Sequence, residues 1–242
     1  MLLYKLKLAI VILIFLLTGC IEKDELTRPV RIQLKIGIAP PDDSPGDRYF
    51  YFNWGHIGVY GIQVEGKREV GEDILFETDP ITNLPPVEFN LHPEIISEFD
   101  IPQGIYTFMR WNFTLKSIET LGLFGTDLQN TGFVIWAIYE YSNESSISIY
   151  FCIDKTELLR FSTFDPDGST RIVLSEYKIH EVNLLLDANY AFQTISRTSI
   201  ENAVISNDLQ GKPVILISRY NNKDLYEHIL NRISQSARVV VF

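Results

Sequence analysis

Short segments in which apolar and polar residues alternate recur along this 242-residue chain and constrain its fold more than any other feature. In residues 30–38, Val30, Ile32 and Leu34 alternate with Arg, Gln and Lys, which is typical of a strand with one buried and one solvated face. Turn-forming residues separate such segments, as in the Pro- and Asp-rich stretch 40–47. We therefore expect strands over residues 30–38, 57–65, 73–77, 87–91, 105–118, 133–141, 146–153, 170–174, 182–186, 213–218 and 238–242.

The number of these strands and the turns between them predict a mainly β protein, a Greek-key β-sandwich with a C-terminal helix. The helix is expected over residues 222–236, where Leu225, Ile229 and Ile233 share one face. The long strand 105–118 is expected to bend at a bulge and pass from one sheet to the other.

Two other segments are expected to be helical. Residues 92–99 could hold one helical turn before Pro102, and residues 187–203 one or two short helices. Since no repeat or low-complexity linker interrupts the chain, residues 30–242 are interpreted as one β-sandwich domain with a mixed C-terminal part. The alternative is a pair of domains divided near Leu121.

The N-terminus has the organisation of an export signal. Lys5 and Lys7 precede ten consecutive apolar residues, 8–17, a run that is too short for the roughly 20 residues needed to span a bilayer. The sequence Leu-Thr-Gly-Cys at residues 17–20 resembles a bacterial lipobox, which implies a signal peptide of residues 1–19 and a lipid on Cys20. A transmembrane anchor is the alternative interpretation of the apolar run.

The lipobox resemblance makes a covalent lipid on Cys20 the one prosthetic group that we expect, with residues 20–29 as a lipidated tether. One acyl chain anchors a protein only marginally, whereas two or three give stable attachment. The Lys-Asp-Glu triplet at residues 23–25 resembles the surface-export signal of Bacteroidetes lipoproteins. The resemblance implies an outer-membrane protein that faces the medium, and an anchor that faces the periplasm is the alternative.

The charge of the chain excludes one large class of partner. Its formal net charge is −10, and removal of the two lysines within residues 1–19 makes it −12. A nucleic-acid-binding surface needs a basic face, so we expect no nucleic-acid partner.

The sequence carries no catalytic signature. His56, His92, His180 and His228 are far apart and show no metal-ligand spacing, so neither a metal nor a catalytic residue is predicted, and the protein is not expected to be an enzyme. Cys152 lies in an apolar strand segment and is expected to be buried. The Asp-Pro-Asp-Gly-Ser sequence at residues 165–169 favours a plain turn over the start of a calcium loop.

Two segments carry a family resemblance. Residues 99–111 contain a Pro-Gln-Gly turn before an aromatic strand, and residues 56–65 contain an early strand rich in isoleucine and valine. Both resemble the fimbrillin-like and uncharacterised β-sandwich lipoproteins of Bacteroidetes. The resemblance implies a transthyretin- or immunoglobulin-like sandwich that serves adhesion or envelope and fimbrial assembly with other envelope proteins. Residues 238–242 could then act as a strand donated between subunits.

Aromatic residues are concentrated at one place, residues 49–54, where five of six residues carry a ring. Rings on a surface can stack on sugar faces, so Tyr49, Tyr51 and Trp54 are candidate glycan-binding residues. This pattern supports the second functional hypothesis, a glycan-binding lipoprotein of a polysaccharide-uptake system. The alternative is that these rings fill the core, which is also the place expected for Trp111 and Trp136.

Overall fold

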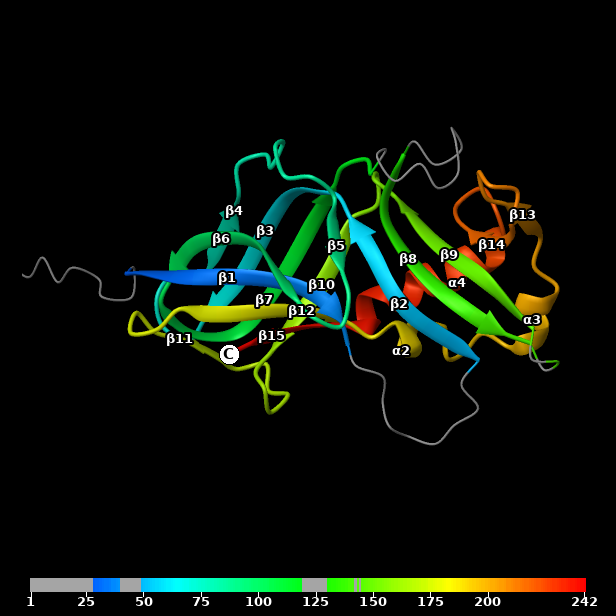
Figure 1. Cartoon of the computed structure of the whole chain (residues 1–242). Helices are drawn as coiled ribbons and strands as arrows, with labels where there is room; N and C mark the ends of the chain where they lie inside the picture. The colour runs from blue at the N-terminus through cyan, green and yellow to red at the C-terminus, as the bar shows by residue number, and fades with distance from the viewer. Residues whose placement is uncertain (1–27, 40–48, 119–129, 142, 144) are drawn as a thin grey trace, which may run out of the picture.

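The computed structural model describes residues 28–39, 49–118, 130–141, 143 and 145–242, and it is mainly β with two sheets (Figure 1). The nine-stranded sheet runs in the order β4-β3-β7-β10-β15-β12-β1-β6, and β11 also pairs with β7. Its strands are β1 (Pro29–Ile38), β3 (Val59–Arg68), β4 (Ile74–Glu77), β6 (Glu94–Pro102), β7 (Gly104–Leu115), β10 (Leu159–Phe164), β11 (Ile172–Leu174), β12 (His180–Leu186) and β15 (Ala237–Val241).

The second sheet has six strands in the order β13-β14-β9-β8-β2-β5. They are β2 (Phe50–Ile57), β5 (Val87–Phe89), β8 (Thr131–Glu140), β9 (Ser146–Asp154), β13 (Ile205–Asn207) and β14 (Pro213–Ile217). Three helices complete the described chain, namely α2 (Ala188–Phe192), α3 (Arg197–Glu201) and α4 (Lys223–Ser236). Cys20 and the triplet at residues 23–25 lie outside the described residues, as does Leu121.

The prediction of a mainly β protein with two sheets and a C-terminal helix is confirmed. The Greek-key connectivity is not confirmed. A Greek key consists of antiparallel strands, whereas β1 pairs in parallel with β12, β10 with β15, and β9 with β14. Strands from before and after residue 121 pair in both sheets, for example β7 with β10 and β2 with β8, so a boundary there would divide both sheets.

Residues 92–99 do not form the expected helical turn. Residues from Glu94 onward form β6, which pairs antiparallel with β1 and buries Ile96, Phe99 and Ile101. Pairing with residues 29–36 of β1 gives this segment backbone hydrogen-bond partners, and its apolar side chains are buried in the core. Such tertiary contacts override a weak local preference.

The prediction that the strand over residues 105–118 passes from one sheet to the other is wrong. All the partners of β7 belong to the nine-stranded sheet, so β7 does not change sheets. One passage between the sheets occurs at Gly58, the single residue between β2 of the six-stranded sheet and β3 of the nine-stranded sheet. A Cβ there would lie 2.3 Å from the backbone oxygen of Lys116, so this crossing requires glycine.

The C-terminal helix is confirmed within one residue of its predicted start. Ile229 and Ile233 of α4 are buried, and the helix leads directly into β15. That last strand lies between β10 and β12 in the interior of its sheet, with Val239 fully buried. The proposal that residues 238–242 are donated to another subunit is therefore wrong for this fold, because the strand already completes its own sheet.

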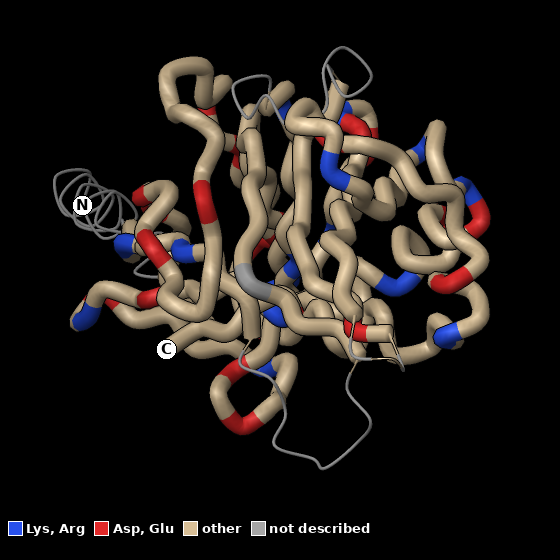
Figure 2. The backbone as a smooth tube through the Cα atoms, turned by 45° about the vertical axis from the view of Figure 1, so that its right-hand side comes forward, with Lys and Arg blue, Asp and Glu red and all other residues tan. Residues whose placement is uncertain are grey.

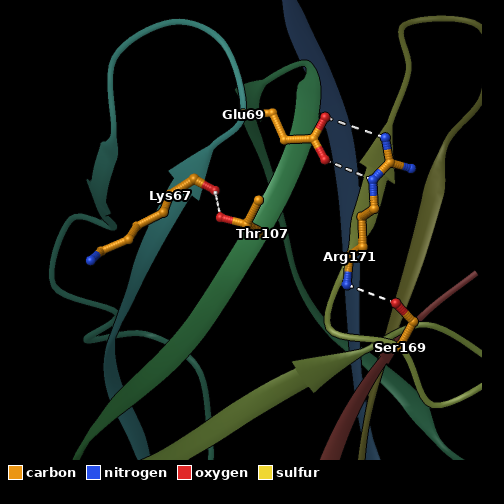
Figure 3. A network of polar contacts seen from close by, with 5 residues as sticks. All are labelled: Lys67, Glu69, Thr107, Ser169 and Arg171. Carbon is orange, nitrogen blue, oxygen red and sulfur yellow. Dashed lines mark hydrogen bonds and ion pairs between the residues drawn. The ribbon is translucent and has the colours of Figure 1, made fainter.

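Residues 165–169 form a turn, as predicted. Gly168 has φ +85°, and Asp165 accepts hydrogen bonds from the backbone of Gly168 and Ser169. Next to it, the Arg171 guanidinium contacts both carboxylate oxygens of Glu69, at 2.7 and 3.3 Å (Figure 3). The backbone N–H of Arg171 also donates to Ser169 Oγ. Arg171 thus links the turn to Glu69, which directly follows β3.

Candidate functional site

The two faces of the six-stranded sheet have different surroundings. On the inner face, Phe192 of α2 contacts the rings of Phe52 and Phe151, and Tyr226 of α4 contacts Phe151. On β8, Ile135 and other alternate residues belong to this core. The residues between them point to the opposite face, which we call the outer face.

The course of β2 places its rings on both faces. Phe50 and Phe52 pack in the main core, and the register with β8 shifts between Phe52 and Trp54. Such an irregularity re-aims the side chains that follow it. As a result Trp54 leaves the core and packs with the outer-face cluster that contains Val134.

Three rings form a row across the outer face, on three neighbouring strands. Trp54 of β2 pairs with Trp136 of β8, which in turn pairs with Tyr150 of β9. The two indole rings lie 5.4 Å apart between centroids at 39°, and all three residues are half-buried. Because neighbouring strands are about 4.8 Å apart, this aromatic row spans about 10 Å.

Further apolar and polar groups border the aromatic row. On one side Tyr51, 43% exposed, pairs with Ile138, and Ile138 pairs with Ser148. On the other side His56 packs edge-on against Trp54, with ring centroids 4.8 Å apart, and pairs with Glu88 of β5. The row is thus an apolar strip bordered by groups that can form hydrogen bonds.

The structure separates the residues that the sequence singled out. Tyr51 and Trp54 lie on the outer face, but Tyr49 does not join them, because its hydroxyl donates to the Ile195 carbonyl and its ring packs under Arg197. Trp111 is fully buried, as predicted.

The prediction for Trp136 is wrong. It lies half-buried on the outer face, since its position in β8 alternates with the core residues. Sequence reasoning also missed Tyr150. The hairpin of β8 and β9 was predicted, but the pairing of Trp136 with Tyr150 depends on the register of the hairpin, which the sequence analysis did not assign. The face on which both residues lie depends on the packing of the helices against the other face.

Polar atoms of the outer face differ in their surroundings. Burial lowers the pKa of His56 below its ordinary value, while the nearby Glu88 carboxylate opposes that shift. Burial raises the pKa of Tyr150, and the Asp208 carboxylate adds to the effect. The buried Nε1 of Trp136 has no hydrogen-bond partner among the described residues.

Cys152 is buried, as predicted, and lies on the outer face beside Val134. Complete burial raises the pKa of its thiol, so the reactive thiolate is disfavoured. In the described part of the chain, no group of three or more His, Cys, Asp or Glu residues is placed to hold a metal ion.

A cleft of about 540 Å³ lies between α3 and the start of α4. Its lining includes Lys223, Asp224 and His228, and the His228 ring contacts Thr194 Oγ1 at 2.6 Å. Among the described residues that line it, only His228 has an aromatic side chain. The aromatic row is therefore the better candidate for a binding surface.

Comparisons with known proteins assign no family. No protein-family model matches the chain, and neither a curated protein nor a solved structure matches it. Among the residues that the structure describes, no helix is long and apolar enough to cross a bilayer.

Proposed function

We propose that this chain is a lipid-anchored, non-catalytic protein of the outer membrane, exposed at the cell surface, that binds glycan chains through the aromatic row. The row of Trp54, Trp136 and Tyr150 is the observation that carries the proposal. Apolar patches rimmed by polar groups mark interaction sites on soluble domains. Aromatic rings contribute large apolar contact area, and Tyr and Trp add a polar group at the edge.

The proposed anchor rests on the sequence of residues 1–25. A lipid on Cys20 would leave residues 20–28 as the link to β1, which begins at Pro29. Fully extended, nine residues span at most about 30 Å, so the domain would stay close to the membrane.

Adhesion or envelope assembly, our first hypothesis from the sequence, now has less support than glycan binding. Its proposed donor strand, β15, is an interior strand. The glycan hypothesis, by contrast, has additional support, because Trp136 and Tyr150 lie beside Trp54 on neighbouring strands.

The proposal is tested by calorimetric titration of the protein, purified in detergent from the cells that express it, with cellohexaose, laminarihexaose, mannohexaose and oligogalacturonate. We expect Trp136→Ala to weaken binding at least tenfold. The matched control is Tyr177→Ala, because Tyr177 is 90% exposed between β11 and β12, outside the six-stranded sheet. Absence of binding to all four, or equal binding by Trp136→Ala and the unaltered protein, would refute glycan recognition by the row.

Surface anchoring needs a separate measurement. We expect protease treatment of intact cells to degrade the protein, and Cys20→Ala to release it from the membrane fraction. Protection of the unaltered protein in intact cells would instead indicate a periplasm-facing anchor.

A further inference from the structure

The six-stranded sheet has an unusual distribution of charge. Its strands contain three carboxylates, Glu88, Glu140 and Asp154, and no Lys or Arg. The nine-stranded sheet carries basic residues in several strands, such as Arg31 and Arg110. Figure 2 shows long stretches of the backbone that carry neither Lys or Arg nor Asp or Glu. A ligand lying across the six strands would therefore meet carboxylates and no strand-borne cation.

Carboxylates also lie near both ends of the aromatic row. Glu88 is exposed and pairs with His56, the neighbour of Trp54. Towards the other end, Asp208 directly follows β13, in the turn that leads into β14, and β14 is the strand next to β9 and its Tyr150. The Asp208 carboxylate is held in place because it accepts hydrogen bonds from the backbone of Gln210 and Lys212, at 2.8 and 2.9 Å.

The cations nearest to this sheet along the chain lie outside its strands. Lys155 directly follows β9, and Lys212 and Arg219 occupy the turns before and after β14. Arg197 lies over the Tyr49 ring and donates to the Glu140 carbonyl, so it is already engaged at the end of β8. No strand of the sheet thus offers the guanidinium or ammonium group with which proteins pair carboxylate and sulfate groups.

We infer that the aromatic row is selective for uncharged glycans and rejects chains that carry uronate or sulfate groups. This inference rests on the proposed glycan-binding function. Like charges placed opposite one another suppress wrong partners, and an acidic chain would approach Glu88 and Asp208 without a compensating cation on the strands. The acidic balance of the whole chain adds to this repulsion at long range.

The test compares cellohexaose, laminarihexaose and mannohexaose with hexameric oligogalacturonate, by titration at about 10 mM and about 150 mM salt. We expect at least one neutral hexamer to bind at least tenfold more tightly than oligogalacturonate at low salt. The difference should shrink at higher salt, because the Debye length falls from about 30 Å to about 8 Å. Glu88→Lys should raise the affinity for oligogalacturonate severalfold relative to the affinity for the neutral hexamer, and Glu88→Gln should raise this ratio to a smaller extent.

The outcomes separate this inference from the function on which it rests. If oligogalacturonate binds as tightly as every neutral hexamer and Trp136→Ala abolishes that binding, charge selection is wrong and the glycan site stands. If no hexamer binds, the proposed function and the inference both fail. A Glu88→Lys protein that gains no affinity for oligogalacturonate relative to the neutral hexamer while its melting temperature is unchanged would also overturn the inference.

Discussion

Replacement of Gly58 by alanine tests the crossing between the two sheets. Gly58 lies in the interval between β2 and β3, where its N–H donates to the Gly132 carbonyl and its carbonyl accepts from Lys116 N–H. The added Cβ would lie 2.3 Å from the Lys116 oxygen and 3.0 Å from Ile118 Cγ2. The first of these is a backbone atom, so a change of side-chain rotamer cannot relieve the overlap.

The expected cost follows from these contacts. Overpacking at a buried position costs about 1–3 kcal/mol. To relieve the overlap, the neighbouring strands would have to move away from residue 58. This movement would weaken its backbone hydrogen bonds to Gly132 and Lys116, each worth about 1 kcal/mol. We expect Gly58→Ala to lower the free energy of unfolding by about 2–4 kcal/mol, which for a domain of this size lowers the melting temperature by roughly 5–15 °C.

Urea and thermal unfolding, followed by circular dichroism, measure this change. The matched control is Gly61→Ala in β3, because its Cβ meets only Thr114 Oγ1, at 2.8 Å, and Thr114 is an exposed side chain that can rotate. We expect less than about 1 kcal/mol there. Equal costs at Gly58 and Gly61 would refute the argument that the sheet crossing requires glycine.

Four further predictions concern buried groups and the anchor. Trp111→Phe removes the 2.9 Å bond from Nε1 to Thr163 Oγ1 and should cost about 1–3 kcal/mol in urea unfolding, part of which Thr163→Val should restore. Burial lowers the pKa of His180, whose Nε2 accepts a hydrogen bond from Ser175 N–H, so the unfolded chain binds a proton at a higher pH than the folded chain does. The free energy of unfolding should therefore fall as the pH drops below about 6.5. His180→Gln should reduce this dependence of stability on pH. Cys152→Ser should cost about 1–3 kcal/mol, and the native thiol should resist maleimide until urea unfolds the chain. Cys20→Ala should abolish metabolic labelling with palmitate, and retained label would refute lipidation at this residue.

The local sequence pattern was sufficient to predict those strands and helices in which buried residues recur at a single regular spacing. The alternation in β1 and the shared face of Ile229 and Ile233 in α4 both predict the observed structure. The pattern failed for β6, because its strand state depends on pairing with β1, which is remote in the sequence. It also gave no strand over β2, where rings follow one another without alternation and their faces are assigned by pairing with β8.

The candidate site could be predicted only in part for the same reason. A cluster of rings at residues 49–54 was visible, but the division between Tyr49, held by Ile195 and Arg197, and Trp54 depends on the irregular pairing of β2 with β8. Trp136 joins the row only because strands far apart in sequence become neighbours. Side-chain direction along a strand is a local property, whereas the composition of a row across strands is set by register.

The position of the proposed tether indicates which part of the domain would lie near the membrane and which part would lie away from it. β1 begins at the left end of the molecule in Figure 1, and the strands of the aromatic row, β2, β8 and β9, lie on the right. With a lipid on Cys20 and a link of at most about 30 Å, the nine-stranded sheet would face the membrane. The row would then lie in the part of the domain remote from the bilayer, where a glycan chain outside the cell can reach it. A tether moved to the end of β8 should therefore reduce glycan capture by intact cells while the affinity of the purified protein stays the same.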